Sequence, residues 1–289
     1  MSPVTEIGLL ASRELRRSVR SVKGLILGII TLVGAVLASL VLTWVEGQKV
    51  AEAGSREALV ELRRQMLEKQ TGDAGLARYL ASMPQSLRSF LDLTIWLGPL
   101  LVALLGFDAV AGELQHRSVR FWAVRSRRSS YFAGKLLGLW ALVALVTVVL
   151  SLLVDGFALV RGFVGAADIL RWGSRFALVA VVIAGPWAAI ATFISSTFKQ
   201  PIGALLTTFG TFFLLWVVNV AGVATRARAL AETGTLPRPH LWEYVYPNAY
   251  DNLLLSPEPG KVAIALGVLL GFVALATAGG SLLFARRDL

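Results

Sequence analysis

The chain has 289 residues, of which 56% are hydrophobic and 16% are charged, and its mean hydropathy is +0.68. Soluble domains carry about a quarter charged residues, so a soluble globular protein is excluded and a membrane protein is indicated. The formal net charge is +10. We attribute this charge to membrane topology and do not expect nucleic acid as a partner. No cysteine is present, so disulfides are excluded.

Residues 1–24 precede the first apolar segment, and they predict an amphipathic helix at the membrane interface. One apolar stripe with spacings of three and four consists of Val4, Ile7, Ala11, Leu15, Val19 and Val22. Charged residues fall largely on other faces: Glu6, Arg13, Arg16, Arg17 and Arg20. We expect this basic side to meet anionic lipid headgroups. The alternative is a plain extension of the first span.

Six apolar segments are long enough to cross a bilayer, which takes about 20 residues of helix. They are residues 25–45, 93–110, 136–154, 176–194, 202–223 and 262–284. All should be helices, because unsatisfied backbone groups are costly in lipid. The expected fold class is therefore all-α. Residues 1–289 should form a single polytopic membrane domain with six transmembrane helices.

The distribution of charge predicts that both termini are cytoplasmic. In that orientation the shorter cytoplasmic parts and the longer outer loops each carry 14 Lys and Arg residues. Four acidic residues accompany the cytoplasmic set, and 13 accompany the outer set. The cytoplasmic parts thus have the higher basic density, which the positive-inside rule favours. The turn 112–135 satisfies the rule best, with six basic residues and one acid.

Two outer loops are expected to carry structure of their own. Residues 46–92 predict an extracytoplasmic helical hairpin with its break at 71–73, because the loop is too long to be structureless. This hairpin either docks an extracytoplasmic partner or only caps the spans. The loop 224–261 is rich in proline and aromatic residues, which are typical of a membrane interface. There we expect a short interfacial or re-entrant helix near 240–255.

The sequence lacks the residues of an energy-transducing or catalytic site. Gly134-Lys135 comes closest to a phosphate-binding loop, but Ser129 stands where the first glycine is needed. The two histidines, His116 and His240, fall on opposite sides of the membrane in this topology. We therefore expect no enzyme activity, no metal and no directly bound cofactor. Asp108 is the one acid inside a predicted span, and it lies at that span's end.

The segment around 107–135 resembles a known family, the permease subunits of type-2 ABC exporters. The residues that match the family motif are Asp108, Gly112, Glu113, Gly134 and Lys135. Ser118 stands where threonine is usual, and Arg128 also matches. Arg117 replaces a glycine of the family and Arg125 replaces a proline. The similarity is greatest to the half-size, six-span permease that serves nitrous-oxide-reductase maturation.

This resemblance implies a partnership and a mechanism. A second permease protomer and separate ATPase subunits, which bind ATP and Mg²⁺, would complete an exporter in the bacterial cytoplasmic (inner) membrane. The ATPase would push on a cytoplasmic coupling helix at 118–125. The implied interface residues are Glu113, Arg117, Ser118, Arg120, Phe121, Trp122, Arg125 and Arg128. Two alternatives remain: a non-transporting anchor for a cytoplasmic complex, and an ion-coupled carrier that depends on Asp108.

Overall fold

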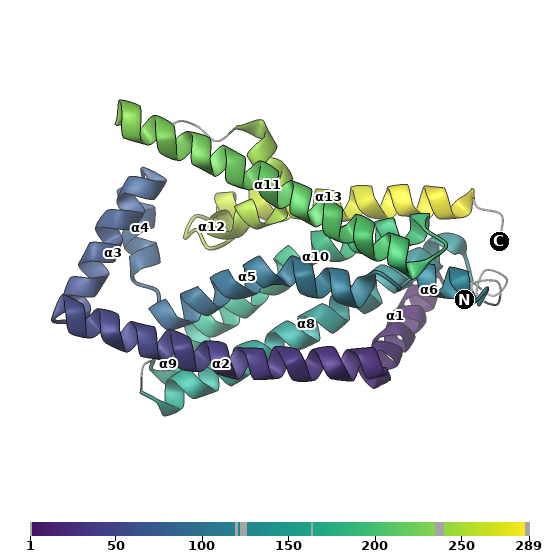
Figure 1. Cartoon of the computed structure of the whole chain (residues 1–289), viewed down its shortest axis with the longest axis horizontal. Helices are drawn as coiled ribbons and strands as arrows, with labels where there is room; N and C mark the ends of the chain where they lie inside the picture. Colours follow the sequence, from purple (N-terminus) through teal and green to yellow (C-terminus); the bar gives the residue numbers. More distant parts are fainter. Residues whose placement is uncertain (1, 119–120, 122–125, 163, 235–239, 287–289) are drawn as a thin grey trace.

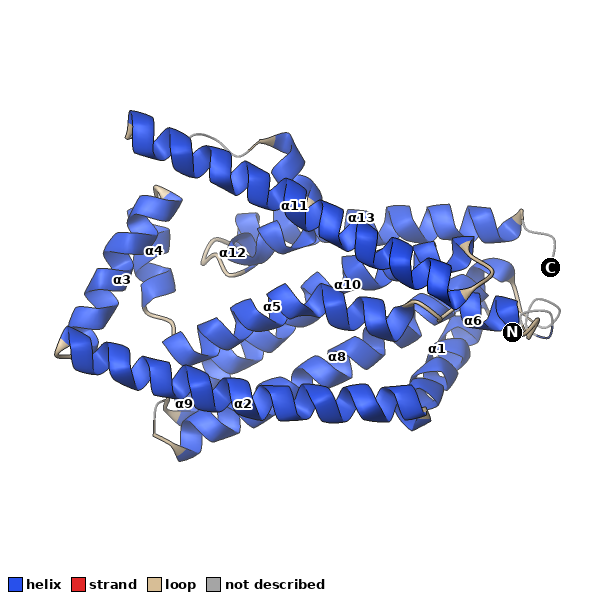
Figure 2. Cartoon of the chain, in the orientation of Figure 1, coloured by secondary structure: helices blue, strands red, loops and turns tan. Residues whose placement is uncertain are grey.

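The computed structural model of the chain describes residues 2–118, 121, 126–162, 164–234 and 240–286. Within these residues all regular secondary structure is helical (Figure 2). Six helical segments are long and apolar enough to cross a membrane. The expectation of an all-α polytopic membrane protein with six spans is therefore confirmed.

The membrane-crossing helices are longer than the apolar segments that predict them. They are α2 (Val22–Ala53), α5 (Gln85–Gly106), α8 (Arg128–Val160), α10 (Ser174–Thr197), α11 (Pro201–Thr233) and α13 (Pro259–Ala285). Five of them contain the whole predicted span. The second differs, because α5 ends at Gly106 and a turn at 107–110 separates it from α6 (Ala111–Gln115). Pro186 lies inside α10 without ending it.

Helix α10 forms the centre of the bundle. It packs against α5, α8 and α13, and 67% of its most apolar stretch is buried, against 11% for α2. Figure 1 shows α2 along one side of the molecule and α11 and α13 along the other, with α5, α8 and α10 between them. The buried indole of Trp187 donates a hydrogen bond to Asn248 (2.7 Å), whose amide donates to the Ile95 carbonyl (2.7 Å). These bonds join α10 and α5 to the loop before α13.

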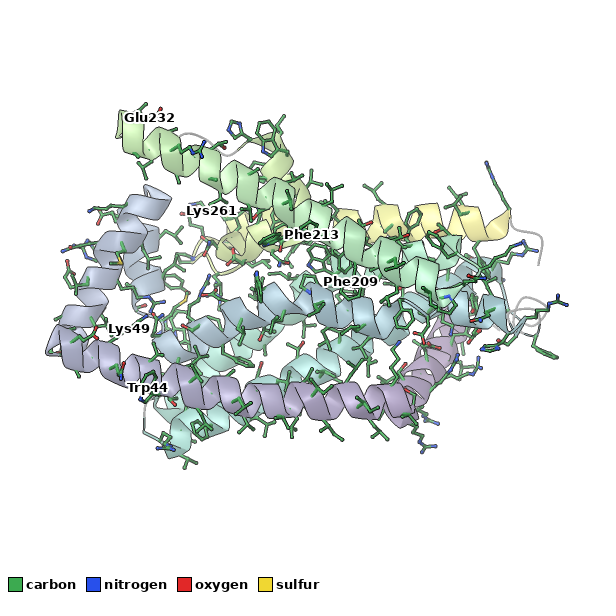
Figure 3. All side chains as sticks on the ribbon, in the orientation of Figure 1. Trp44, Lys49, Phe209, Phe213, Glu232 and Lys261 are labelled. Carbon is green, nitrogen blue, oxygen red and sulfur yellow. The ribbon has the colours of Figure 1, made fainter. Side chains whose placement is uncertain are left out.

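The two ends of the bundle hold different structures. One end holds both chain termini, α1 (Pro3–Arg20) and α6, and we call it the terminal end (Figure 1). The other end holds α3 (Arg56–Thr71), α4 (Ala74–Ala81) and α12 (Asp251–Leu254), and we call it the hairpin end. In Figure 3, Lys49 and Glu232 mark where α2 and α11 reach the hairpin end.

At the hairpin end, α3 and α4 pack against each other. Gly72 ends α3 in the left-handed region (φ 67°), and Asp73 caps α4 by accepting from the Gly75 and Leu76 amides (2.9 and 3.0 Å). Residue 85 already begins α5, so the second helix of the hairpin is short. Arg88 of α5 donates to Asp251 of α12 at 2.9 Å, which ties the hairpin end together.

Several short helices fill the remaining connections. A three-residue helix, α9 (Ala166–Asp168), and a π-helical turn, η1 (Ile169–Gly173), lead into α10. Near 240–255, where a short interfacial or re-entrant helix is expected, the structure has a series of short helical elements. Two 3-10 turns, η2 (Leu241–Val245) and η3 (Pro247–Tyr250), precede α12 there. Pro247, which has no amide hydrogen to donate, starts a new turn and so separates η3 from η2.

Candidate functional site

A sharp elbow at Ser21 turns α1 away from α2. The Ser21 hydroxyl donates to the Ser18 carbonyl (2.8 Å) and accepts from the Gly24 amide (2.9 Å), so it closes one helix and caps the next. A Cβ at Gly24 would overlap the Ser18 carbonyl oxygen. Glycine is therefore required for the elbow, which directs α1 back against α8 instead of continuing the span.

Helix α1 lies against α8 at unusually close range. A Cβ at Gly134 would lie 2.5 Å from the Leu10 Cβ, and one at Gly138 would lie 2.6 Å from the Glu14 Cβ. The two glycines are four residues apart and therefore share one helix face. Small residues at this spacing let two helix backbones approach closely. This contact carries Glu14 of α1 to the side of α8 that holds Lys135.

Lys135 lies at the centre of a buried ionic cluster, which consists of Glu14, Arg17, Glu113, Tyr131 and Lys135. The Lys135 ammonium lies 2.5 Å from Glu14 Oε2 and 2.7 Å from Glu113 Oε1. Arg17 also donates to Glu113 Oε1 (2.7 Å), and the Tyr131 hydroxyl donates to Glu113 Oε2 (2.8 Å). Lys135 and Glu113 are only 3% and 2% exposed. The cluster therefore joins α1, α6 and α8, and its central pair of Lys135 and Glu113 is shielded from water.

The charges of the ionic cluster balance. Two carboxylates face two cations, and the tyrosine supplies a further donor. Desolvating an ion costs several kcal/mol, which is recovered only if partners and hydrogen bonds satisfy the charges. Removing one member would leave an uncompensated buried charge. We infer that the cluster fixes the position of α6 relative to α1 and α8, since α6 can move only if these bonds break or move with it.

The turn that separates α5 from α6 is held by two further groups. Ser195 of α10 accepts hydrogen bonds from the Val110 and Ala111 amides (both 3.0 Å) and donates to the Phe107 carbonyl (2.8 Å). These bonds satisfy amides at the start of α6 that have no partner within the helix. Lys23 of α2 pairs with Asp108 at 2.5 Å.

A small polar cavity lies between this ion pair and the ionic cluster. Its volume is about 110 Å³, and its lining includes Glu14, Arg17, Lys23 and Asp108. The motif acids Asp108 and Glu113 therefore belong to two adjacent ionic groups. Asp108 pairs with Lys23, which follows the elbow at Ser21, whereas Glu113 pairs with Arg17, which precedes it. Both groups tie the end of α5 and the start of the following segment to the N-terminal part of the chain.

Only some of the predicted interface residues lie in the part of the chain that the structure describes. Arg117 is exposed and has φ 56°, a left-handed conformation that favours glycine. This explains physically why glycine suits the position in the family. The Ser118 hydroxyl donates to the Glu113 carbonyl (3.4 Å), and Phe121 is 72% exposed. Arg120, Trp122 and Arg125 lie outside the described residues, so most of the predicted coupling helix at 118–125 does too.

The remaining motif residues have structural positions. Gly112 lies in α6, and its amide donates to the Asp108 carbonyl (3.0 Å). Arg128 is the first residue of α8. Of the predicted site residues, the structure thus brings Glu113 and Lys135 into direct contact. It places Asp108 nearby and leaves Arg117 and Phe121 at the surface.

Five residues of this region were not predicted from the sequence to belong to the site: Glu14, Arg17, Lys23, Tyr131 and Ser195. One signal was available for Glu14, because it follows Ile7 and Ala11 at helical spacing and so places an acid on the apolar face of α1. Nothing in the sequence joins Ser195 to residue 110, since that contact depends on how α10 packs.

An apolar cavity of about 310 Å³ lies between α2, α5, α8 and α10. Pro99 of α5 and Trp187 of α10 contribute to its lining, and Thr31, Thr94 and Thr147 are polar exceptions. The part of the chain that the structure describes holds no group of three His, Asp or Glu residues that could bind a metal. Several buried charged residues pair with partners of opposite charge, as in the ionic cluster and in the pair of Arg226 with Glu243.

The six spans and the ionic cluster at one end define a polytopic membrane protein in which the segment between the second and third spans is anchored to the N-terminal helix. Comparison with known families identifies the particular class. The family model described as ABC-2 family transporter protein matches residues 9–289, and the chain belongs to this family. The expected type-2 ABC permease is thereby confirmed. A search of curated proteins found no significant match. The narrower similarity to the nitrous-oxide-reductase maturation permease stays a prediction.

Proposed function

We propose that this chain is the translocating subunit of an ABC exporter, driven by a separate ATPase that docks on the segment 112–135. The observation that carries the proposal is the buried ionic cluster. Glu113 is the second residue of this segment and Lys135 is its last, and the two side chains are in direct contact. A force applied to the segment would therefore be passed to α8 and, through Glu14 and Arg17, to α1.

The exposed part of the segment suits a protein partner. Phe121 presents a large aromatic side chain to solvent, and Arg117, four residues earlier in the chain, is exposed as well. Aromatic and arginine side chains are enriched among the residues that dominate protein interfaces. In this proposal ATP and Mg²⁺ bind on the partner, the terminal end faces the cytoplasm, and a second permease protomer completes the transporter.

The test is co-purification of the permease with its ATPase, followed by measurement of ATP turnover. Phe121→Ala should weaken ATPase retention by about tenfold or more, because truncating an interface anchor costs upwards of about 1–2 kcal/mol. The double change Arg120→Glu with Trp122→Ala should do the same. Trp242→Ala, an exposed aromatic at the hairpin end, serves as the matched control and should change neither quantity.

If both interface variants retain the ATPase and its full turnover, the coupling role is wrong. The anchor hypothesis would then be favoured if the complex forms but no substrate moves. An ion-coupled carrier is disfavoured by the pairing of Asp108 with Lys23, which gives that acid a structural partner. Loss of transport in ATPase-free vesicles on Asp108→Asn would revive the carrier.

A further inference from the structure

The outer face of α1 carries an open groove, which shares only Arg17 with the ionic cluster. The groove has a volume of about 630 Å³ and is lined by Leu9, Ser12, Arg13, Arg16, Arg17, Arg20 and Ser21. Four of its residues are arginines, and no acidic side chain among the described residues lines it. The arginines recur at spacings of three and four, so they share a face of the helix. This arrangement is suited to an anion that presents several oxygens.

The groove ends where the membrane span begins. Ser21 forms its last wall, and Val22 is the first residue of α2. Val22, Leu25 and Ile26 are 73%, 56% and 52% exposed, an apolar surface that requires hydrocarbon around it. The guanidinium groups therefore lie beside the level at which acyl chains meet phosphates. A soluble acidic partner would fit the arginines but not the apolar surface that continues from them.

We propose that this groove binds the headgroup of an anionic phospholipid, whose acyl chains lie along the exposed face of α2. Each basic residue near an anionic membrane surface contributes to such binding, and the contribution falls off within a Debye length. Two adjoining surfaces thus define the ligand. The arginines bind its phosphate, and its acyl chains cover Val22, Leu25 and Ile26.

Arg17 links this lipid site to the ionic cluster. Its side chain lines the groove, is 51% exposed, and donates to the buried Glu113 at 2.7 Å. A phosphate in the groove would share this guanidinium with Glu113. The lipid would thereby favour the position of Arg17 that holds α6 in place. This regulatory consequence rests on the proposed function, whereas the binding itself does not.

Binding is tested on the purified permease alone, in detergent, by native mass spectrometry with phosphatidylglycerol and phosphatidylcholine. The permease should retain phosphatidylglycerol in preference, and added salt should weaken the retention. Arg16→Gln with Arg20→Gln should weaken it by about tenfold or more. Arg228→Gln, which removes an exposed arginine at the hairpin end, should leave it unchanged.

A second double variant, which conserves both positive charges, controls for misfolding. Arg16→Lys with Arg20→Lys should keep most of the affinity and the wild-type thermal midpoint, which also checks the fold of the glutamine pair. Equal retention of both lipids, or equal loss with Arg228→Gln, would overturn the proposal. So would a glutamine pair that releases the ATPase while its lipid retention is unchanged, because the groove would then serve a protein.

The regulatory consequence has a separate readout. In reconstituted vesicles, ATP turnover of the complex should rise with the phosphatidylglycerol fraction, and this rise should be absent in the glutamine pair. A permease that binds the lipid but recruits no ATPase would refute the proposed function and leave the lipid site intact. A complex that is active in neutral lipid to the same extent would refute the regulation.

Discussion

At the scale of single residues, Lys135 shows that a residue of the family motif can be required by the packing of the protein itself. The residue directly precedes the predicted span 136–154, a position at which the sequence alone suggests only that the lysine helps to set the membrane topology. Its ammonium instead lies between two carboxylates from two other helices. The two acids could not be buried side by side without it, because like charges at short range repel strongly in a medium of low dielectric.

We therefore expect Lys135→Met to lower the free energy of unfolding by roughly 3–5 kcal/mol, since it leaves Glu14 and Glu113 buried without their shared cation. Thermal unfolding of the detergent-purified permease measures the loss. The matched control is Lys261→Met, which removes a partly exposed lysine paired with Glu258 at 2.8 Å. It should cost less than about 1 kcal/mol. Similar losses in both variants would show that the cluster contributes little.

Arg117 is a second residue whose conformation makes a prediction. Its φ of 56° costs a non-glycine residue roughly 1–2 kcal/mol. Arg117→Gly should therefore raise the free energy of unfolding by up to about 1 kcal/mol, after the greater freedom of glycine in the unfolded chain is subtracted. Arg127→Gly is the control, because φ there is −65° and glycine should only destabilise. A fall in the thermal unfolding midpoint of both variants would contradict the inference that the backbone at Arg117 is strained.

At the scale of elements, the packing of α1 against α8 depends on two glycines of α8, which have no side chain to keep the helices apart. Gly134 and Gly138 leave the space into which Leu10 and Glu14 fit. By contrast, Gly267 and Gly271 of α13 have the same spacing and meet no neighbouring atom within 4 Å. The spacing alone therefore does not identify a helix contact within the chain.

Gly134→Val should displace α1 and destabilise the permease by roughly 1–3 kcal/mol, as overpacking of a close contact does. It should also expose Ala11, and a cysteine placed there should react faster with a maleimide than in the parent. Gly267→Val provides the control and should change neither the unfolding midpoint nor the reaction rate. An unchanged rate with Gly134→Val would mean that α1 is held by its charges alone.

At the scale of the whole molecule, the two ends are chemically distinct. The terminal end gathers α1, α6 and both termini, and the hairpin end gathers α3, α4 and α12 (Figure 1). An even number of spans places the termini together, but it does not choose the side. The proposal that the terminal end is cytoplasmic rests on the density of Lys and Arg.

Single-cysteine labelling tests this orientation without background, because the chain has no cysteine. Val4 and Met66 are 79% and 65% exposed and lie at opposite ends. A membrane-impermeant maleimide should label Met66→Cys on intact cells and Val4→Cys only after permeabilisation. The reverse pattern would show that the terminal end faces outward, and the proposed ATPase site would then lie outside the cytoplasm.

The sequence by itself determined the fold class and the number of spans, because hydrophobic length is a property of each segment alone. It also determined the break at Gly72 and Asp73, where local turn and capping preferences act. The family motif further indicated where the function should lie.

Only the tertiary structure decided what the motif residues contact. Glu14 and Glu113 are 99 positions apart in the sequence, and they share Lys135 because an elbow at Ser21 and two glycines of α8 bring α1 into place. Ser195 holds a turn 85 residues earlier in the chain for the same reason. Burial of a charge depends on packing from several helices at once, so no local pattern could reveal that these ions are partners.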